Sequence, residues 1–549
     1  MSVLDQISRR QSVSDVLKNS SLRGGLRKVL GVGDLLAFGI SSTLGSGIFV
    51  TVGVISQFAG PGLFLSFAIA SFGCLLSAYC YAEFGCRLPV SGQSYTYTYV
   101  ALGELVAFIT GWLGFLAYSI ATAAVSRGWA THLATLIRSA WGLSLPAWLV
   151  DSPVESLPHV SISGLAAFLN LACTILACLG ITHSTRLAYI LVIINFSLMV
   201  GFSLYGAVSY GSPSNLTPLL PFGLTGVLKG SGLAFFCSTG WELTCTLSEE
   251  VKHPGRDLPR GIMGALLAVT VLYCAVCLTL SSMVPFNLIS VSAPIADAFL
   301  FHEDKKGALL VAFTVVVVCI PSTISGIIGT PRIIYKMAQD GLLFPCLGSI
   351  NKHGSPVTAT VLCGFFSAVL AGFLNFESLA ATCSACTLFM FTLVCIGVLV
   401  IRVNDHSFSN KSRLSSRLTL SLPVFVLTSF LFCTLLVETD FSFDVWVAIF
   451  GLLNLASAAL CVKLYKSALQ ESFQTSLIGQ ALVIEDTSLA REIFLCPYVP
   501  FLPLLAAWGN ILMIASLGYK ALVGLTSLLI SGLIIYFSYG IQHSKLRSR

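Results

Sequence analysis

Charged side chains are scarce in this 549-residue sequence. Asp, Glu, Lys and Arg together make up 10% of the chain, whereas a typical soluble protein has about 25%. A soluble domain of this length would need many more charged groups to cover its surface. The shortage therefore excludes an ordinary soluble enzyme, a disordered scaffold and a nucleic-acid-binding protein.

Patterns typical of metal sites and catalytic centres are also missing. The 8 histidines are scattered without the spacing of metal ligands, and no HExxH, GxSxG or paired-carboxylate arrangement falls on a predicted interface. Of the 18 cysteines, 17 fall in apolar segments and one, Cys346, falls in a polar loop, so no structural disulfide is expected. We therefore expect no metal, no cofactor and no enzyme activity.

Long apolar runs are what the sequence has instead. Hydrophobic residues make up 56% of the chain and the mean hydropathy is +0.89. A helix that spans a bilayer needs about 20 apolar residues, so these runs predict an all-α polytopic membrane protein. The fourteen predicted spans are approximately 33–55, 62–84, 103–127, 159–181, 187–209, 226–247, 262–285, 307–329, 356–375, 378–400, 419–438, 444–464, 496–517 and 521–541.

Lysine and arginine are distributed unevenly between the polar segments. With the N-terminus inside, 24 of the 30 basic residues fall on the cytoplasmic side, which is the asymmetry that sets membrane orientation. The first 30 residues are polar and basic and contain no apolar stretch typical of a cleaved signal peptide. Both termini are therefore expected in the cytoplasm. The six remaining basic residues are Arg127, Arg138, Lys229, Lys305, Lys306 and Lys520.

Two predicted spans contain residues that interrupt a helix. In the first span, two glycines flank a serine at 45–47, and glycine inside a helix costs about 1 kcal/mol relative to alanine. In the sixth span, the run 236–242 (Phe-Cys-Ser-Thr-Gly-Trp-Glu) places glycine, hydroxyls and the carboxylate of Glu242 at the midpoint. An ionisable group at that depth indicates a cavity or a partner. The interruptions lie five spans apart, as in transporters built from two inverted repeats.

A pair of broken helices suits one class of ligand. A helix N-terminus presents unpaired N–H groups and a positive dipole, which bind a carboxylate, and a helix C-terminus presents carbonyls that bind an ammonium group. Two breaks that face each other would hold a zwitterionic α-amino acid. A polyamine has no carboxylate and fits this arrangement less well.

Several ordered motifs resemble those of one known family. The run 45–50 (Gly-Ser-Gly-Ile-Phe-Val) resembles its first-span break, and 249–254 (Glu-Glu-Val-Lys-His-Pro) resembles the loop after its sixth span. The runs 331–344 and 534–544 resemble the loop after its eighth span and its last span. Over nearly all of residues 30–545, the chain is similar to the cationic amino acid transporters of the amino acid–polyamine–organocation (APC) superfamily.

The resemblance implies a fold and a division of the chain. The fold is LeuT-like, with a ten-helix core of two inverted five-helix repeats, broken first and sixth helices, and about fourteen transmembrane helices in total. The implied regions are a cytoplasmic N-terminal tail at 1–30, the transport core at 31–400, a cytoplasmic loop at 401–418, four accessory helices at 419–541 and a cytoplasmic C-terminal tail at 542–549.

The resemblance also implies where a substrate binds. The substrate carboxylate would lie on the first break, and the α-amino group would meet main-chain carbonyls of the sixth span. The ring of Phe236 would close over the substrate as a gate. Glu242 would either attract a cationic side chain or pair with a polar neighbour and hold the unwound segment. The implied substrate-binding residues are Thr43, Gly45, Ser46, Gly47, Phe236, Cys237, Thr239 and Glu242.

Other polar residues of the spans are candidates for the side-chain pocket or for structural contacts. The side-chain pocket would be built from spans three, six and eight, with Ser119, Thr122, Ser322 and Thr323 as candidates. Two carboxylates at the inner ends of spans are interpreted as structural, and one of them, Glu83, would pair with a basic loop residue. The other is Glu104.

Asn195 occupies the position where proton-coupled relatives carry a lysine in span five. A neutral amide cannot accept a proton near neutral pH, although it can donate to a first-helix carbonyl. The residue therefore predicts a uniporter driven by the substrate gradient and the membrane potential.

The predicted function is facilitated transport of cationic L-amino acids (arginine, lysine, ornithine) by alternating access. The expected partners are the amino acid substrate and the lipid bilayer. Transport of neutral amino acids or polyamines remains an alternative, as does a non-transporting amino acid sensor with the same fold. The plasma membrane and a vacuolar or lysosomal membrane both fit the sequence.

Overall fold

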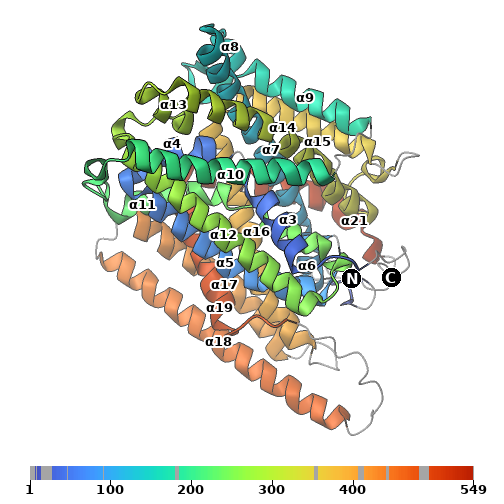
Figure 1. Ribbon diagram of the computed structural model, residues 1–549. Coiled ribbons are helices and arrows are strands. Elements are labelled where there is room, and N and C mark those ends of the chain that lie inside the picture. The colour runs from blue at the N-terminus through green and yellow to red at the C-terminus, as the bar shows by residue number, and fades with distance from the viewer. Residues whose placement is uncertain are drawn as a thin grey trace.

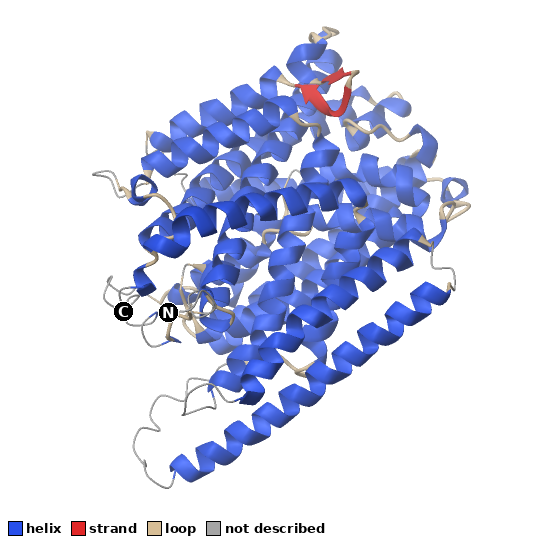
Figure 2. Cartoon of the chain, turned by 180° about the vertical axis from the view of Figure 1, so that it is seen from behind, coloured by secondary structure: helices blue, strands red, loops and turns tan. Residues whose placement is uncertain are grey.

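The computed structural model is almost entirely helical (Figures 1 and 2). It describes residues 7, 9–13, 16, 28–45, 47–90, 92–179, 185–350, 356–405, 413–439, 444–480 and 494–547. Labels follow Figure 1 and begin at α3. The helices of four or more residues are α3 (Val32–Thr43), α4 (Ile48–Ala59), α5 (Leu63–Arg87), α6 (Gln93–Ala101), α7 (Glu104–Trp141), α8 (Ala147–Val150), α9 (Gly164–Cys178), α10 (Thr185–Tyr210), α11 (Gly223–Cys237), α12 (Pro254–Met283), α13 (Pro294–Phe301), α14 (Lys305–Gln339), α15 (Val357–Phe373), α16 (Phe376–Asp405), α17 (Arg413–Glu438), α18 (Val445–Gln480), α19 (Phe501–Ser516) and α20 (Tyr519–Ile535).

Shorter elements complete the chain. A 3₁₀ helix, η3 (Trp241–Glu250), follows α11, and the strands β1 (Ser152–Val154) and β2 (Leu157–Ile162) form one antiparallel hairpin. A π-helical turn (Tyr536–Gly540) joins α20 to α21 (Ile541–His543). Further 3₁₀ turns lie at Gly60–Gly62, Pro213–Leu216, Phe286–Leu288, Pro345–Gly348 and Lys545–Arg547.

Each of the fourteen predicted spans contains a described helix. Within the described residues, nine helical stretches are long and apolar enough to cross a membrane, and α9, α15 and α19 are apolar but shorter. The first and sixth predicted spans are each divided, into α3 and α4 and into α11 and η3. The count of nine is smaller than fourteen because Ile48–Arg87 joins α4 and α5 in one stretch, and because α9, α15, α19 and the divided sixth span are too short to be counted.

Several boundaries differ from the predicted ones. Helix α7 continues to Trp141, beyond residue 127, and α18 continues to Gln480 through a stretch expected to be loop. The predicted span 159–181 begins with strand β2, and its helix starts only after Ser163. The Ser163 hydroxyl accepts from the Ala166 amide (3.4 Å) and so caps the new helix. Hydropathy marks apolar residues but not these capping contacts.

Helices five spans apart pack against each other in four cases. The pairs are α4 with α11, α5 with α12, α7 with α14, and α9 with α15. This pairing of equivalent helices is expected for two inverted repeats that share one core. It brings the two broken spans together at the centre of the bundle.

The bundle has two distinct ends. Glu104, at the start of α7, accepts a hydrogen bond from Ser544 near the C-terminus (2.5 Å), and Arg9 and Lys545 line the same cavity. The far end of α7 leads into the β1–β2 hairpin. We call these the termini end and the hairpin end. Helix α16 is almost wholly buried inside the bundle, while α18 lies at its edge (Figure 1).

Candidate substrate site between two broken helices

The first break lies between Thr43 and Ile48. Leu44 leaves helical geometry (φ −77°, ψ 70°), and α4 starts with Gly47 as its N-cap. A helix that ends here leaves its last carbonyls without the amide donors of a continuing helix, although the Gly45 amide donates locally to the Thr43 carbonyl (2.8 Å). Two of them find donors on other helices, since Tyr273 of α12 donates to the Thr43 carbonyl (3.1 Å) and Asn195 of α10 donates to the Leu44 carbonyl (3.4 Å).

The second break follows Cys237, where α11 ends. Gly240 has φ +107°, a conformation that favours glycine, and the chain then continues as the 3₁₀ helix η3. A Cβ on Gly240 would lie 2.2 Å from the Ser42 carbonyl oxygen at the end of α3. Only glycine therefore permits this contact between the unwound segment and the first broken helix. Both interruptions predicted from the sequence are confirmed.

The two breaks face each other at close range. A Cβ on Gly47 would lie 3.0 Å from Cε1 of Phe236 and 3.3 Å from the Cys237 sulfur. The N-terminus of α4, with amides that have no acceptor in their own helix, therefore lies beside the C-terminus of α11, whose last carbonyls have no donor from a further helical turn. The arrangement places an anion-binding group next to a cation-binding group.

A cavity of about 2180 Å³ runs from the breaks to the termini end. Of the predicted substrate-binding residues, Ser46 lies outside the described residues and Glu242 is 1% exposed and does not line the cavity. Asn195 also lines it. The predicted substrate-binding residues that line the cavity are Thr43, Gly45, Gly47, Phe236, Cys237 and Thr239.

Glu242 is held inside the wall of the cavity. Its Oε1 accepts from the Tyr118 hydroxyl of α7 (2.9 Å), and its Oε2 accepts from the Gly240 amide (2.8 Å). The side chain of Glu242 thus binds the backbone of its own unwound segment at Gly240 and connects that segment to α7 through Tyr118. Tyr118 lines the cavity and was not singled out in the sequence, although its spacing of four residues before Thr122 places both on one helix face.

The other side-chain candidates divide into two groups. Thr122 and Ser322 line the cavity, together with Ser325, which sequence reasoning missed. Ser119 and Thr323 lie outside its lining. The Ser119 carbonyl accepts from Ser367 of α15 (2.8 Å), and the Thr323 hydroxyl donates within its own helix to Cys319 (2.9 Å).

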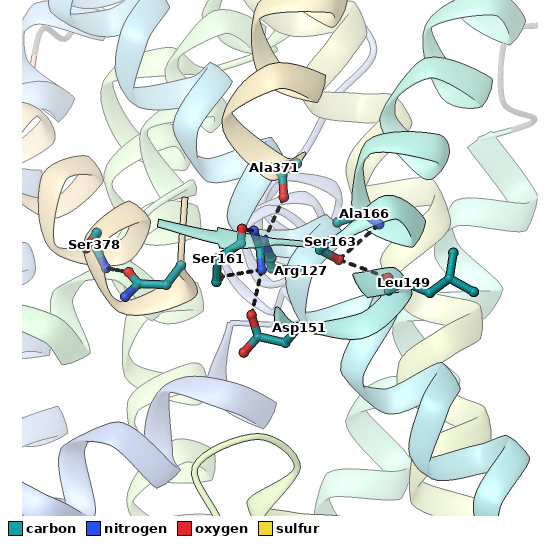
Figure 3. A network of polar contacts seen from close by, with 9 residues as sticks. Arg127, Leu149, Asp151, Ser161, Ser163, Ala166, Ala371 and Ser378 are labelled. Atoms are coloured by element: carbon teal, nitrogen blue, oxygen red, sulfur yellow. Dashed lines mark hydrogen bonds and ion pairs between the residues drawn. The ribbon is translucent and has the colours of Figure 1, made fainter. Parts of the chain in front are cut away.

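The hairpin end carries an ion-pair network centred on a buried arginine (Figure 3). Arg127 of α7 is 3% exposed and donates to Asp151 (2.9 Å), to the Ser161 hydroxyl (2.8 Å) and to the Ala371 carbonyl of α15 (2.6 Å). Val125 still lines the cavity, but Arg127, two residues further along, does not. The network therefore joins α7, the hairpin and α15 just beyond the point where the cavity stops.

Two buried carboxylates lie at the termini end and outside the cavity lining. Glu83 pairs with Arg87 (2.9 Å) and Arg402 (2.6 Å), so its predicted pairing with a basic residue is confirmed, although both partners lie on helices and not in loops. Glu104 accepts from three hydroxyls, those of Tyr99 (3.0 Å), Tyr536 (3.1 Å) and Ser544 (2.5 Å). These contacts fasten α16 and the C-terminal residues to the bundle.

Comparison with known proteins identifies the family. A family model described as "Amino acid permease" matches residues 30–461, and a model described as "C-terminus of AA_permease" matches residues 494–544. The chain is 33% identical over 451 residues to the branched-chain amino acid permease BcaP of Bacillus subtilis (81% of this chain, 96% of the relative). It is 32% identical over 447 residues to the methylthioribose transporter of the same organism (80% and 95%).

A third relative matches over the whole length. The chain is 31% identical over 590 aligned residues to the vacuolar cationic amino acid transporter 4 of Arabidopsis thaliana, which covers 99% of this chain and 97% of the relative. These proteins are transporters and not enzymes, and the family has the LeuT-like fold of the APC superfamily. The chain is therefore a multi-pass membrane protein that belongs to the amino acid permease family.

Proposed function

We propose that the protein is a uniporter of cationic L-amino acids such as arginine, lysine and ornithine. The observation that carries the proposal is the close approach of the α4 N-terminus to the α11 C-terminus across Gly47 and Phe236. The substrate carboxylate would bind the first backbone amides of α4, at the first break beside Thr43. The α-amino group would bind the carbonyls of Phe236, Cys237 and Thr239. The full-length match to a cationic amino acid transporter supports the choice of substrate.

Asn195 supports transport without a coupled proton. Its side chain is 1% exposed and reaches the Leu44 carbonyl at the first break. An amide in this place stabilises the break, but its side chain does not take up or release a proton near neutral pH. A cation that moves inward gains about 2.3 kcal/mol per 100 mV of inside-negative potential. Membrane potential alone would therefore allow accumulation of arginine or lysine.

Phe236 is proposed as the gate on the hairpin side of the substrate. Its ring is 6% exposed, contacts the Gly47 position and packs edge to face on Phe376 (ring centroids 6.0 Å apart, 89°). Phe376 begins α16 just after Leu374, which bridges to Val160 of the hairpin strand. The ring thus stands between the breaks and the hairpin end, while the cavity opens toward the termini end.

The same cavity accommodates a second candidate, the neutral branched-chain amino acids. Apolar side chains of Val125, Ile333 and Met390 line it beside the polar ones, and the one carboxylate at the breaks, Glu242, is withdrawn into the wall. The relative named as a branched-chain amino acid permease also supports this candidate. A neutral substrate would use the same two breaks.

Membrane topology follows the same proposal. The uneven distribution of basic residues supports cytoplasmic termini, and the cavity would then open toward the cytoplasm in this structure. The ten helical segments up to residue 400 would form the transport core, with four accessory helices after residue 418. A plasma membrane or a vacuolar or lysosomal membrane would suit this topology.

Reconstitution in liposomes tests the proposal. Uptake of labelled arginine, lysine and leucine is measured with and without an inside-negative potential, and with and without a pH gradient. We expect arginine and lysine uptake that rises with the potential and is unaffected by the pH gradient. Uptake that requires an inward proton gradient would overturn the uniport mechanism. Uptake of leucine without arginine would favour the neutral substrate.

A further inference from the structure

A segment near the N-terminus lies in the cavity at its termini end. Ile7, Val13 and Val16 pack against the hydrophobic core of the bundle, although they precede α3 in the chain. We call the described residues 7, 9–13 and 16 the mouth segment. Its members that line the cavity are Arg9, Arg10, Gln11, Ser12 and Val16. The mouth segment therefore covers part of the same cavity that the two breaks line.

The chain that follows the mouth segment returns to the wall of the cavity. The amides of Val29 and Leu30 donate to the Glu250 carbonyl (2.9 and 3.0 Å), and Leu30 forms a parallel β-bridge with Val251. Glu250 itself lines the cavity. The N-terminal region is thus held at two places, by apolar packing of the mouth segment and by backbone hydrogen bonds at 29–30.

Ser12 lies in a sequence pattern that serine kinases recognise. Arg9 and Arg10 precede it by three and two residues, Val13 follows it, and no other pair of adjacent arginines occurs in the sequence. Kinases select substrates partly by charge pattern, and two arginines shortly before a serine with an apolar residue after it suit a basophilic serine kinase. Ser12 is exposed, whereas the residues on either side of it are partly buried. An enzyme can therefore reach its hydroxyl.

A phosphate on Ser12 would meet an excess of positive charge. Burial lowers the pKa of the Arg10 guanidinium, whose Nε has no hydrogen-bond partner within the described residues. Phosphoserine carries about two negative charges at neutral pH and binds arginine through charge-assisted hydrogen bonds. It would offset the surplus among the charged residues that line the cavity, which are the basic Arg9, Arg10, Arg332, Lys336 and Lys545 and the acidic Glu249, Glu250 and Asp340.

We propose that Ser12 is a phosphorylation site and that its phosphate holds the mouth segment in the cavity. ATP supplies the phosphoryl group to a basophilic serine kinase. The bond from the γ-phosphorus to the bridging oxygen of ATP breaks, the Ser12 Oγ forms a bond to that phosphorus, and ADP and the hydroxyl proton leave. The inference goes beyond the proposed function and takes from it only the topology, with the termini end in the cytoplasm where ATP is present.

The sign of the effect follows from where the arginines lie. Arg9 and Arg10 are partly removed from water while the mouth segment is docked. A negative charge beside them stabilises the docked segment more than the released one, in which water screens the same pair. The phosphate on exposed Ser12 stays near the solvent, so its own desolvation is small. Phosphorylation therefore favours the state in which the mouth segment covers the cavity.

The test uses the full-length protein in detergent, incubated with ATP and the catalytic subunit of cyclic-AMP-dependent protein kinase. Mass spectrometry measures phosphate on Ser12. N-ethylmaleimide, which is uncharged, then reports how open the cavity is, because Cys237 lines the cavity and Cys346 is exposed elsewhere. We expect phosphorylation to slow alkylation of Cys237 about five- to tenfold, as for one or two charge-assisted hydrogen bonds, and to leave Cys346 unchanged.

Three variants serve as controls. Ser12→Ala should show no response of Cys237 alkylation to the kinase. Ser14→Ala, which keeps Ser12 and both arginines, should respond like the wild type. Val13→Ser combined with Val16→Ser weakens the apolar packing of the mouth segment, so Cys237 should be alkylated faster than in the wild type before any phosphorylation.

Each contrary result removes one part of the proposal. Absence of phosphate from Ser12, under conditions that fully phosphorylate a peptide of residues 5–18, would overturn the modification site. Phosphate on Ser12 with unchanged or faster alkylation of Cys237 would overturn its closing role. Unchanged alkylation in the double valine variant would show that the mouth segment does not cover the cavity. These readouts need no transported substrate, so a failure of arginine uptake would count against the proposed function alone.

Discussion

The two broken helices are held open in different ways. At the first break, the carbonyls of Thr43 and Leu44 accept hydrogen bonds from Tyr273 of α12 and Asn195 of α10, and the Thr43 carbonyl also accepts from the nearby Gly45 amide (2.8 Å). At the second break, most contacts are local. The Ser238 amide donates to the Phe235 carbonyl (2.9 Å), the Thr239 hydroxyl donates to the Phe236 carbonyl (2.8 Å), and the side chain of Glu242 binds the amide two residues before it.

This difference predicts that the two breaks respond differently when the surrounding helices move. The geometry of the first break depends on where α10 and α12 lie, so a movement of these helices would change the carboxylate site directly. The second break takes more of its hydrogen bonds from its own sequence, and its remote contacts include Tyr118 of α7 on Glu242 and Ser71 and Cys74 of α5 on Ser238. We expect the first break to respond to helix movements during alternating access and the second to act as a firm surface against which the substrate amino group is held.

The point where the breaks touch gives the largest predicted effect. In Gly240→Ala, the new Cβ would lie 2.2 Å from a backbone oxygen, in a residue with φ +107°. Strained backbone of this kind costs about 1–3 kcal/mol even without a clash. We expect arginine uptake in proteoliposomes to fall more than about a hundredfold, since strain and clash together exceed roughly 3 kcal/mol.

Gly142→Ala is the matched control for this substitution. Gly142 also has a positive φ (+68°), but nothing lies within 4 Å of its Cβ position at the end of α7. It would lose some stability from backbone strain and keep its transport activity. Normal uptake by Gly240→Ala would mean that the two breaks do not need the contact seen here.

Gly47→Val tests the approach of the breaks from the other side. The Cβ would meet the Phe236 ring at 3.0 Å and the Cys237 sulfur at 3.3 Å, and these side chains can move where a backbone cannot. Overpacking of this kind costs about 1–3 kcal/mol, so we expect roughly a tenfold or greater loss of kcat/KM. Gly33→Val, at an exposed glycine with nothing within 4 Å, should transport normally. Equal uptake by the two variants would contradict the placement of the site.

The sequence allowed the breaks to be located but not the way they are held. Glycines, hydroxyls and a buried acid mark an interruption locally, and hydropathy marks fourteen spans, because both signals belong to short stretches of chain. The partners of the first break, Tyr273 and Asn195, lie 230 and 151 residues from the carbonyls they bind. Asn195 was noticed only through a family resemblance, and Tyr273 gave no signal.

The role of Glu242 shows the same limit. From the sequence, attraction of a cation and support of the unwound segment were equally possible. The structure gives the carboxylate two donors inside the wall, one of them from Tyr118 on a distant helix. Similarly, Ser119 and Thr122 lie three residues apart, and only helix packing determines that Thr122 lines the cavity while Ser119 does not. A one-dimensional pattern cannot distinguish such neighbouring positions.

Tyr273→Phe removes one remote support of the first break and should have an intermediate effect. The substitution keeps the ring of a fully buried residue and deletes the hydroxyl that donates to the Thr43 carbonyl. A neutral hydrogen bond of this kind contributes about 0.5–1.5 kcal/mol, so kcat/KM should fall roughly fivefold. Hydrogen–deuterium exchange of the backbone amides of residues 39–50 should increase in the variant. Unchanged exchange there would contradict the dependence of the first break on α12.

Thr239→Val should have the smallest effect. The valine keeps the shape of threonine and removes a hydroxyl that donates to the Phe236 carbonyl (2.8 Å) within the same turn. The Ser238 amide and the Glu242 side chain still hold the segment, and the Phe236 carbonyl is left free for the substrate amino group. We expect about a twofold change in kcat/KM, at the low end of the range for one neutral hydrogen bond. A loss larger than that of Tyr273→Phe would reverse the comparison, because the second break would then depend more on each of its hydrogen bonds than the first.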